Sequence, residues 1–238
     1  MTPEVGYVQQ IFNRIAPVYD QMNDGLSLGL HRVWKRMAVK WCQPFSGATA
    51  LDLCCGSGDL ARLLAQQVAP YGQVYGVDFS PAQLAIARGR ELAFSLPIAP
   101  LIWAEADVLA LPFRDQTFDC ATMGYGLRNV ADISQSLREL HRVLKPGARA
   151  AILDFHRPGN PQLSRFQRWY LDTFVVPQAR SQGLEAEYAY IFPSLEKFPI
   201  GSEQVEIAHE SGFHRVTHYQ IAGGMMGVLV VQKDGELV

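Results

Sequence analysis

Glycine and acidic residues form the most informative segment of the sequence, Asp52 to Asp59. Within this segment, Gly56-Ser57-Gly58 follows an apolar run and precedes a helical pattern. Glycines at a strand-to-helix junction permit a tight turn and let a ligand approach the backbone amides of the helix N-terminus. The segment also fits the G-x-G-x-x-G/A pattern of dinucleotide sites, so the glycines alone leave the ligand undecided.

Two further acids end the next predicted strands. Asp78 lies about twenty residues beyond the turn, where a carboxylate can accept hydrogen bonds from both hydroxyls of an adenosine ribose. Asp107 ends the following strand, and we expect it to accept a hydrogen bond from an adenine amino group while Val108 offers its backbone amide. Together with the turn, these residues predict a nucleotide-type cofactor site.

Charge separates two classes of cofactor at this site. Asp52 and Asp59 would repel the pyrophosphate of NAD, but not the ammonium and sulfonium groups of S-adenosylmethionine. The acids therefore favour S-adenosylmethionine. An NAD-type oxidoreductase stays open as an alternative, as does a non-catalytic binding module with the same fold.

Short apolar runs alternate with helix-length segments and predict the elements that hold this site. The predicted strands are 48–55, 73–79, 101–107, 120–126 and 148–155. Helical apolar stripes fall at 60–69, 80–93 and 133–144. Because ligands of open parallel sheets bind beyond the carboxyl ends of the strands, this α/β pattern places the predicted site residues at one edge.

The flanking segments complete a single predicted domain of four parts. They are an N-terminal helical lid at 1–45, a cofactor-binding core at 46–155, a substrate-covering helical insert at 156–200, and a C-terminal helix with a strand hairpin at 201–238. The insert is rich in aromatic residues, and it could either line a tunnel for a substrate tail or pack on the core. The last two strands are expected to form an antiparallel pair at the sheet edge.

Composition excludes several functions. The 21 basic and 23 acidic residues give a net charge of −2, so we expect no nucleic acid partner. The sequence start lacks the apolar core of a secretory signal, and no apolar run has transmembrane length, so we expect a cytoplasmic chain, with peripheral membrane contact left open. Cys42, Cys54, Cys55 and Cys120 show no CxxC spacing, so no metal site is expected.

The sequence resembles the class I methyltransferases that methylate ring carbons of ubiquinone and menaquinone precursors, the quinone C-methyltransferases. The resemblance covers nearly the whole chain. Its most specific motifs are Tyr19-Asp20 with Met22-Asn23-Asp24, and Gly126-Leu127-Arg128-Asn129, whereas Lys145-Pro146-Gly147 is shared by class I methyltransferases in general. The turn and the Ile15-Ala16-Pro17-Val18-Tyr19-Asp20 opening look most like cyanobacterial and plastid members, whose product is phylloquinone.

The resemblance implies a Rossmann-like seven-stranded sheet, with N-terminal helices and a helical insert before the last strands. It also assigns cofactor contacts. The predicted cofactor-binding residues are Asp52, Gly56, Ser57, Gly58, Asp78, Asp107, Val108, Gly124 and, on the lid, Tyr19.

The reaction implied is C-methylation of a prenylated naphthoquinol, the last type of step in phylloquinone synthesis. Demethylmenaquinol and a ubiquinone precursor are the alternative substrates, and a homo-oligomer is left open. Arg128 and Asn129 are predicted to act on the quinol oxygen, with Arg128 stabilising a phenolate because arginine holds its proton too tightly to be a base. His156 is a candidate proton acceptor, whereas His214 and His218 receive no role.

Overall fold

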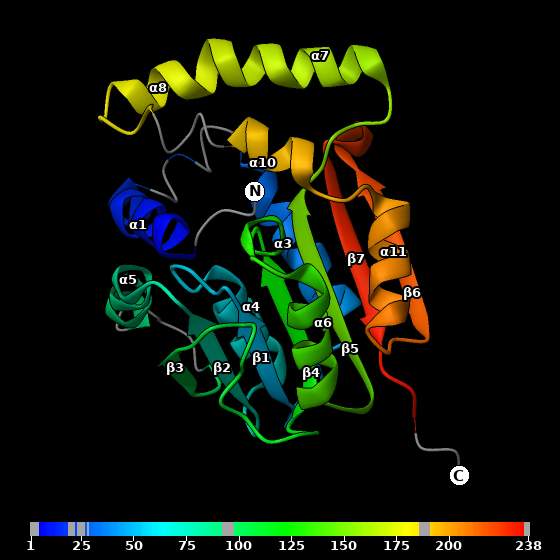
Figure 1. Cartoon of the computed structure of the whole chain (residues 1–238). Coiled ribbons are helices and arrows are strands. Elements are labelled where there is room, and N and C mark those ends of the chain that lie inside the picture. The colour runs from blue at the N-terminus through cyan, green and yellow to red at the C-terminus, as the bar shows by residue number, and fades with distance from the viewer. Residues whose placement is uncertain are drawn as a thin grey trace.

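A mixed seven-stranded sheet forms the centre of the protein (Figure 1). The computed structural model describes residues 5–18, 22, 27, 29–91, 98–185 and 191–235 of the 238-residue chain. In spatial order the strands are β3 (Leu101–Glu105), β2 (Gln73–Asp78), β1 (Thr49–Leu53), β4 (Phe118–Gly124), β5 (Leu144–Phe155), β7 (Met226–Gln232) and β6 (Arg215–Ile221). The predicted α/β sheet of seven strands is therefore confirmed.

The strands fall into a parallel part and an antiparallel edge. Strands β3, β2, β1, β4 and β5 pair in parallel, whereas β7 runs antiparallel to both β5 and β6. The predicted antiparallel pair is thus correct. Strand β5 begins earlier than expected, because Leu144 already pairs with Phe118 and the register then shifts before Arg149 pairs with Cys120.

Amphipathic helices cover both faces of the sheet. On one face lie α3 (Leu30–Trp41) and α4 (Asp59–Val68), and on the other α6 (Ile133–Val143) and α11 (Gly201–Glu210) (Figure 1). Helix α5 (Pro81–Glu91) follows β2 and contacts β3. In α4 the buried side chains recur at helical spacing, so one stripe of the helix packs on the sheet and the other faces solvent.

The remaining helices gather above the carboxyl ends of the parallel strands (Figure 1). The N-terminal elements are α1 (Val5–Ile15) and η1 (Ala16–Val18). The insert contains α7 (Pro161–Tyr170), the π-helical turn η3 (Leu171–Val175), α8 (Val176–Arg180) and α10 (Ile191–Lys197). A separate apolar cluster joins the two parts, because Ile11 and Ile15 pack with Val175 and Ala179.

Two short 3-10 turns, η2 (Leu127–Asn129) and η4 (Ala222–Gly224), complete the described elements. Within the described part of the chain, no helix combines the length and apolar character needed to cross a lipid bilayer. The division at residues 45, 155 and 200 into lid, core, cover and C-terminal unit stays a prediction.

Candidate active site

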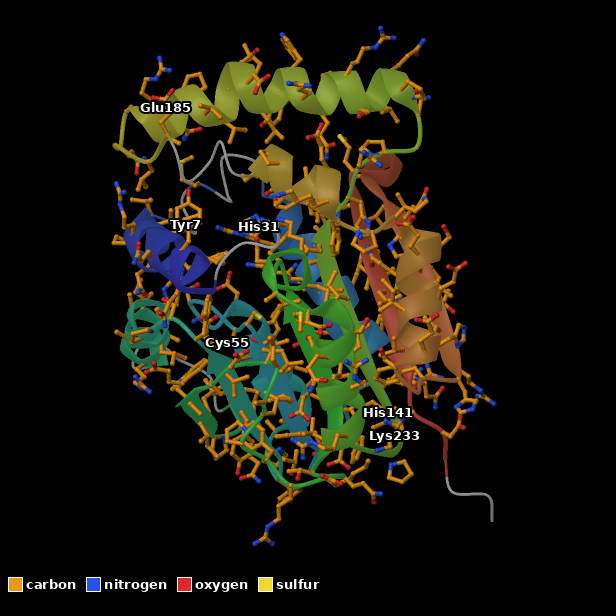
Figure 2. All side chains as sticks on the ribbon, in the orientation of Figure 1. Tyr7, His31, Cys55, His141, Glu185 and Lys233 are labelled. Atoms are coloured by element: carbon orange, nitrogen blue, oxygen red, sulfur yellow. The ribbon has the colours of Figure 1, made fainter. Side chains whose placement is uncertain are left out.

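The turn between β1 and α4 is held by backbone hydrogen bonds to its neighbours. Cys55 N donates to Val77 O at 2.9 Å, and Gly58 N donates to Cys55 O at 2.9 Å. Cys54 adopts a left-handed φ of 49° and Gly58 one of 85°, so the chain reverses sharply before α4 begins. Cys55, labelled in Figure 2, marks this turn, and Cys54, Cys55, Gly56 and Ser57 all line one pocket.

Asp78 closes the same turn from β2. Its Oδ2 accepts from Gly56 N at 2.8 Å, and its Oδ1 accepts from Ser80 N at 2.9 Å. Burial raises the pKa of Asp78 to about 6, against the opposing effect of these backbone donors. The carboxylate lines the pocket, as the sequence predicted for a residue at this strand end.

Asp52 has both oxygens engaged within the protein. One accepts from Thr122 Oγ1 at 2.7 Å and the other from Ala61 N at 2.9 Å, and the residue is fully buried. Burial raises its pKa to about 7. Asp52 lines the pocket, but its two hydrogen bonds give it mainly a structural role, because they connect β1 to β4 and to the start of α4.

Asp59 is neutralised by three cations. Its carboxylate lies 2.7 Å from Lys35 Nζ and 3.7 Å from Arg90 Nη1, and it also pairs with Arg62. Burial acts to raise the pKa of Asp59, yet Lys35 and the arginines lower it below the usual value. The sequence suggested that Asp59 would repel the pyrophosphate of NAD. Because these cations offset its charge, Asp59 no longer supports that argument.

The end of β3 supplies a second wall of the pocket. Asp107 and Val108 both line it, and Asp107 Oδ1 accepts from Leu109 N at 2.9 Å. Ala106 N donates to Asp78 O at 3.1 Å, which fixes this wall relative to Asp78. From β4, Gly124 also lines the pocket, and a Cβ added there would lie 2.6 Å from Leu60 Cδ1.

Buried polar atoms of the pocket lack hydrogen-bond partners among the described residues. They are Nε2 and Oε1 of Gln83 and Oδ1 of Asn129. A buried polar group without a partner costs free energy, so these atoms indicate a polar ligand. Sequence reasoning missed Gln83 and Lys35. The only sequence signal for these two residues is that each is a polar residue next to the apolar positions of a predicted amphipathic helix.

Arg128 is not among the residues that line the pocket, and its side chain forms a buried ion pair beside the pocket residue Asn129. Its Nη1 lies 2.5 Å from Asp154 Oδ1, its backbone N donates to Asp154 Oδ2 at 3.1 Å, and its guanidinium lies 5.2 Å from the Phe155 ring centroid. Asn129 lines the pocket, and its Nδ2 donates to Tyr125 O at 3.1 Å. Asp154 was also missed, although it stands at a strand end like Asp78.

His156 forms a buried pair that the sequence did not predict. Its Nε2 lies 3.3 Å from His218 Nε2, and its Nδ1 lies 3.5 Å from Gln204 Nε2. Gly227 makes room for the pair, because a Cβ there would lie 2.5 Å from His218 Nε2. Burial, with His218 and Arg128, lowers the pKa of His156 to about 3. This geometry gives no support to His156 as the proton acceptor.

Gly58 does not line the pocket, and instead forms the left-handed residue directly before α4. Tyr19, predicted to lie on the lid, is outside the described residues.

A mixed sheet of this strand order, with β7 antiparallel and a pocket at the carboxyl ends of the parallel strands, is the architecture of class I methyltransferases. Solved methyltransferase structures share the fold at low sequence identity. A SAM-dependent methyltransferase from Thermotoga maritima superposes with a TM-score of 0.67 at 18% identity, covering 95% of this chain and 100% of that one. Phosphoethanolamine N-methyltransferase 2 of Haemonchus contortus, solved with S-adenosyl-L-methionine, gives a TM-score of 0.61 at 16% identity, covering 84% of this chain and 52% of that one.

The chain belongs to the ubiE/COQ5 methyltransferase family, whose model matches residues 2–233. The 2-phytyl-1,4-naphtoquinone methyltransferase of Nostoc punctiforme is 66% identical over 226 residues, covering 95% of this chain and 98% of that protein. The chloroplastic 2-phytyl-1,4-beta-naphthoquinone methyltransferase of Arabidopsis thaliana is 48% identical over 224 residues, covering 94% of this chain and 86% of that protein. The chain is therefore a methyltransferase that uses S-adenosylmethionine, and the NAD alternative is set aside.

The buried histidine predicts a pH dependence of folding. The lowered pKa of His156 means that the unfolded chain takes up a proton near pH 6.5 that the folded protein excludes. Keeping His156 neutral therefore costs the folded protein no stability above that pH, and it destabilises the folded protein relative to the unfolded chain as the pH falls below it. We expect His156→Gln to reduce the difference in free energy of unfolding between pH 7.5 and 5.5 by about 1.4 kcal/mol, measured by urea titration.

His214→Gln is the matched control, since the His214 side chain is 71% exposed and its ion pair with Asp234 lies at the surface, where such pairs contribute little to stability. It should leave the pH difference as in the unchanged protein. An equal pH difference in His156→Gln and the unchanged protein would contradict the excluded proton.

Proposed function

We propose that this chain methylates a ring carbon of a reduced 2-phytyl-1,4-naphthoquinone. The observation that carries the proposal is the similarity to relatives from Nostoc punctiforme and Arabidopsis thaliana whose names state that substrate, at 66% and 48% identity over nearly the whole chain. The reduced ring is the reactive form, because loss of a hydroxyl proton spreads negative charge onto the neighbouring ring carbon. We also propose a cytoplasmic chain that meets its lipophilic substrate at a membrane.

The pocket fits S-adenosylmethionine, which supplies a methyl group on an electrophilic sulfonium. In our assignment Asp78 accepts the two ribose hydroxyls, and the unpartnered amide of Gln83 reaches the adenosine portion. Asp107 and the backbone of Val108 take the adenine edge. The glycine turn at Gly56 supports this fit, because small residues there let a ligand lie against the backbone.

Arg128 and Asn129 are the proposed acceptor-side residues. Asp154 fixes the Arg128 side chain, so its positive charge has one position near the end of β4 and lowers the free energy of a quinol phenolate. Asn129 Oδ1, unpartnered among the described atoms, can accept a hydrogen bond from a quinol hydroxyl or an ordered water. Because reaction requires alignment more than covalent help, these residues mainly orient the ring and exclude water.

Cofactor affinity should depend on the ionisation of Asp78. The pKa of Asp78 is raised to about 6, and only the ionised carboxylate accepts two ribose hydrogen bonds. The affinity for the cofactor is therefore highest at about pH 7 and above, where Asp78 is ionised, and it falls as the pH decreases through about 6. We expect the dissociation constant of S-adenosylhomocysteine, measured by calorimetry, to rise about tenfold between pH 7 and pH 5.

Asp78→Asn tests the cause, because Asp52 titrates in a similar range. The variant should bind weakly and show no such pH dependence, whereas Asp115→Asn, at an exposed acid, should behave as the unchanged protein. The assignment of Asp78 would be refuted by a variant that keeps the tenfold change.

Methyl transfer tests the proposed function directly. With radiolabelled S-adenosylmethionine, we expect label in reduced 2-phytyl-1,4-naphthoquinone, and slower transfer to reduced demethylmenaquinone and to a benzoquinol precursor. Arg128→Lys keeps a cation beside Asp154 but loses the planar guanidinium, so turnover should fall about hundredfold with little change in S-adenosylhomocysteine affinity. Transfer to none of the three quinols would reject the substrate while leaving the methyltransferase class intact.

A further inference from the structure

The insert helix exposes a contiguous set of aromatic rings, Phe166, Trp169 and Phe174, which we name the aromatic surface. Their exposed fractions are 48%, 51% and 51%. Trp169 contacts the other two, with ring centroids 5.7 Å from Phe166 and 5.4 Å from Phe174. Soluble proteins seldom leave large apolar side chains exposed side by side, so such a surface indicates a partner.

The three rings of the aromatic surface are not part of the buried cluster that joins the insert to α1, although Phe166 and Phe174 contact Tyr170 at its margin. The contact between the insert and α1 is made by Val175 and Ala179, which are fully buried with Ile11 and Ile15 of α1. The rings also lie outside the residues that line the cofactor pocket. Folding and cofactor binding therefore leave the three rings without an explanation.

Positive charge accompanies the rings. Between residues 157 and 185 the chain carries four arginines, at positions 157, 165, 168 and 180, and two acids, Asp172 and Glu185. Both acids have arginine partners, since Asp172 lies 3.9 Å from Arg168 and Glu185 pairs with Arg180. The segment thus has an excess of two positive charges in a chain whose net charge is −2, which leaves −4 on the rest.

The location of this helix matches a role in substrate delivery. It forms the outermost layer above the carboxyl ends of the strands, with Glu185 near one end, and side chains tipped with nitrogen project outward from it (Figure 2). Helix α1 lies between it and the site, because Ile11 packs under α8 while Phe12 lines the pocket. A quinol with a phytyl tail partitions into lipid, so it would reach the pocket from this side.

We propose that the outer side of α7, η3 and α8 docks on an anionic lipid bilayer, with Phe166, Trp169 and Phe174 entering the interface and Arg165 meeting lipid headgroups. This proposal rests on the proposed function, because only a lipophilic quinol substrate gives the enzyme a reason to bind a membrane. It adds the surface through which the enzyme would collect that substrate. Aromatic rings beside arginines suit the boundary between headgroups and acyl chains. A second copy of this chain is the poorer occupant, because a two-fold contact would set arginines against arginines.

Vesicle sedimentation tests the docking. The full chain is mixed with vesicles of phosphatidylcholine alone or with one quarter phosphatidylglycerol, at 0.1 M and 0.5 M salt. We expect binding to the anionic vesicles that weakens at high salt, as charge attraction requires. No preference for anionic vesicles would overturn the proposal.

Matched variants separate the two contributions. Trp169→Ser with Phe174→Ser, and Arg165→Gln alone, should each lower vesicle affinity, the arginine variant by about fivefold or more. The controls are Tyr71→Ser, at a tyrosine that is 85% exposed, and Arg215→Gln on β6, and both should bind as the unchanged chain. Unchanged S-adenosylhomocysteine affinity verifies that each variant is folded.

Three outcomes would overturn the proposal in favour of another occupant or none. The first is that the ring variant turns a dimer into a monomer in sedimentation without loss of vesicle binding. The second is that it raises the Michaelis constant for the phytyl substrate but not for a tail-less quinol, with vesicle binding intact. The third is unchanged behaviour throughout. Methyl transfer to the tail-less quinol without vesicles tests the proposed function separately, so either idea can fail alone.

Discussion

Burial of carboxylates at the carboxyl edge of the sheet is the constraint on which the site depends. Asp52, Asp78 and Asp154 are exposed by 0%, 5% and 1%. A carboxylate removed from water must recover its hydrogen bonds, and here backbone N–H groups of adjoining segments provide them. Each acid therefore fixes a piece of backbone as well as carrying charge: the start of α4, the glycine turn and the turn after β4.

This arrangement divides the acids by task. Asp52 and Asp154 make their hydrogen bonds within the protein, Asp52 with Thr122 and Asp154 with Arg128. Asp78 keeps a place on the pocket wall while closing the turn at Gly56. A buried ion pair adds little net stability compared with apolar packing, so Arg128–Asp154 is better understood as a device that fixes the orientation of the arginine.

The sequence was sufficient for the elements and for most of the pocket wall. Strand and helix positions follow local periodicity, and parallel strands necessarily bring residues such as Asp78 and Asp107 to one edge. The side chains that pair with site residues could not be predicted from the sequence. Lys35 meets Asp59 across 24 positions and His218 meets His156 across 62, and such pairings exist only once helices and strands have packed.

Two features show why charge and aromatic content mislead when read along the chain. Asp59 looked like an uncompensated acid because two of its three cations, Lys35 of α3 and Arg90 of α5, come from helices far from it in sequence, and only Arg62 is a local neighbour. The aromatic insert was expected to line a tunnel or pack on the core, and periodicity alone cannot say that Trp169 faces outward while Val175 faces inward. In Gly227 the sequence did hold a clue to the histidine pair, since a glycine within a strand often marks a close approach.

Amide hydrogen exchange with and without S-adenosylhomocysteine is the most direct test of the claim that carboxylates at the sheet edge build the cofactor pocket. We predict slower exchange in three segments that are far apart in sequence, 54–58, 78–83 and 106–109, because all three border the pocket. The amides that Asp78 accepts, at Gly56 and Ser80, should be among those protected. Protection confined to other segments would contradict the account.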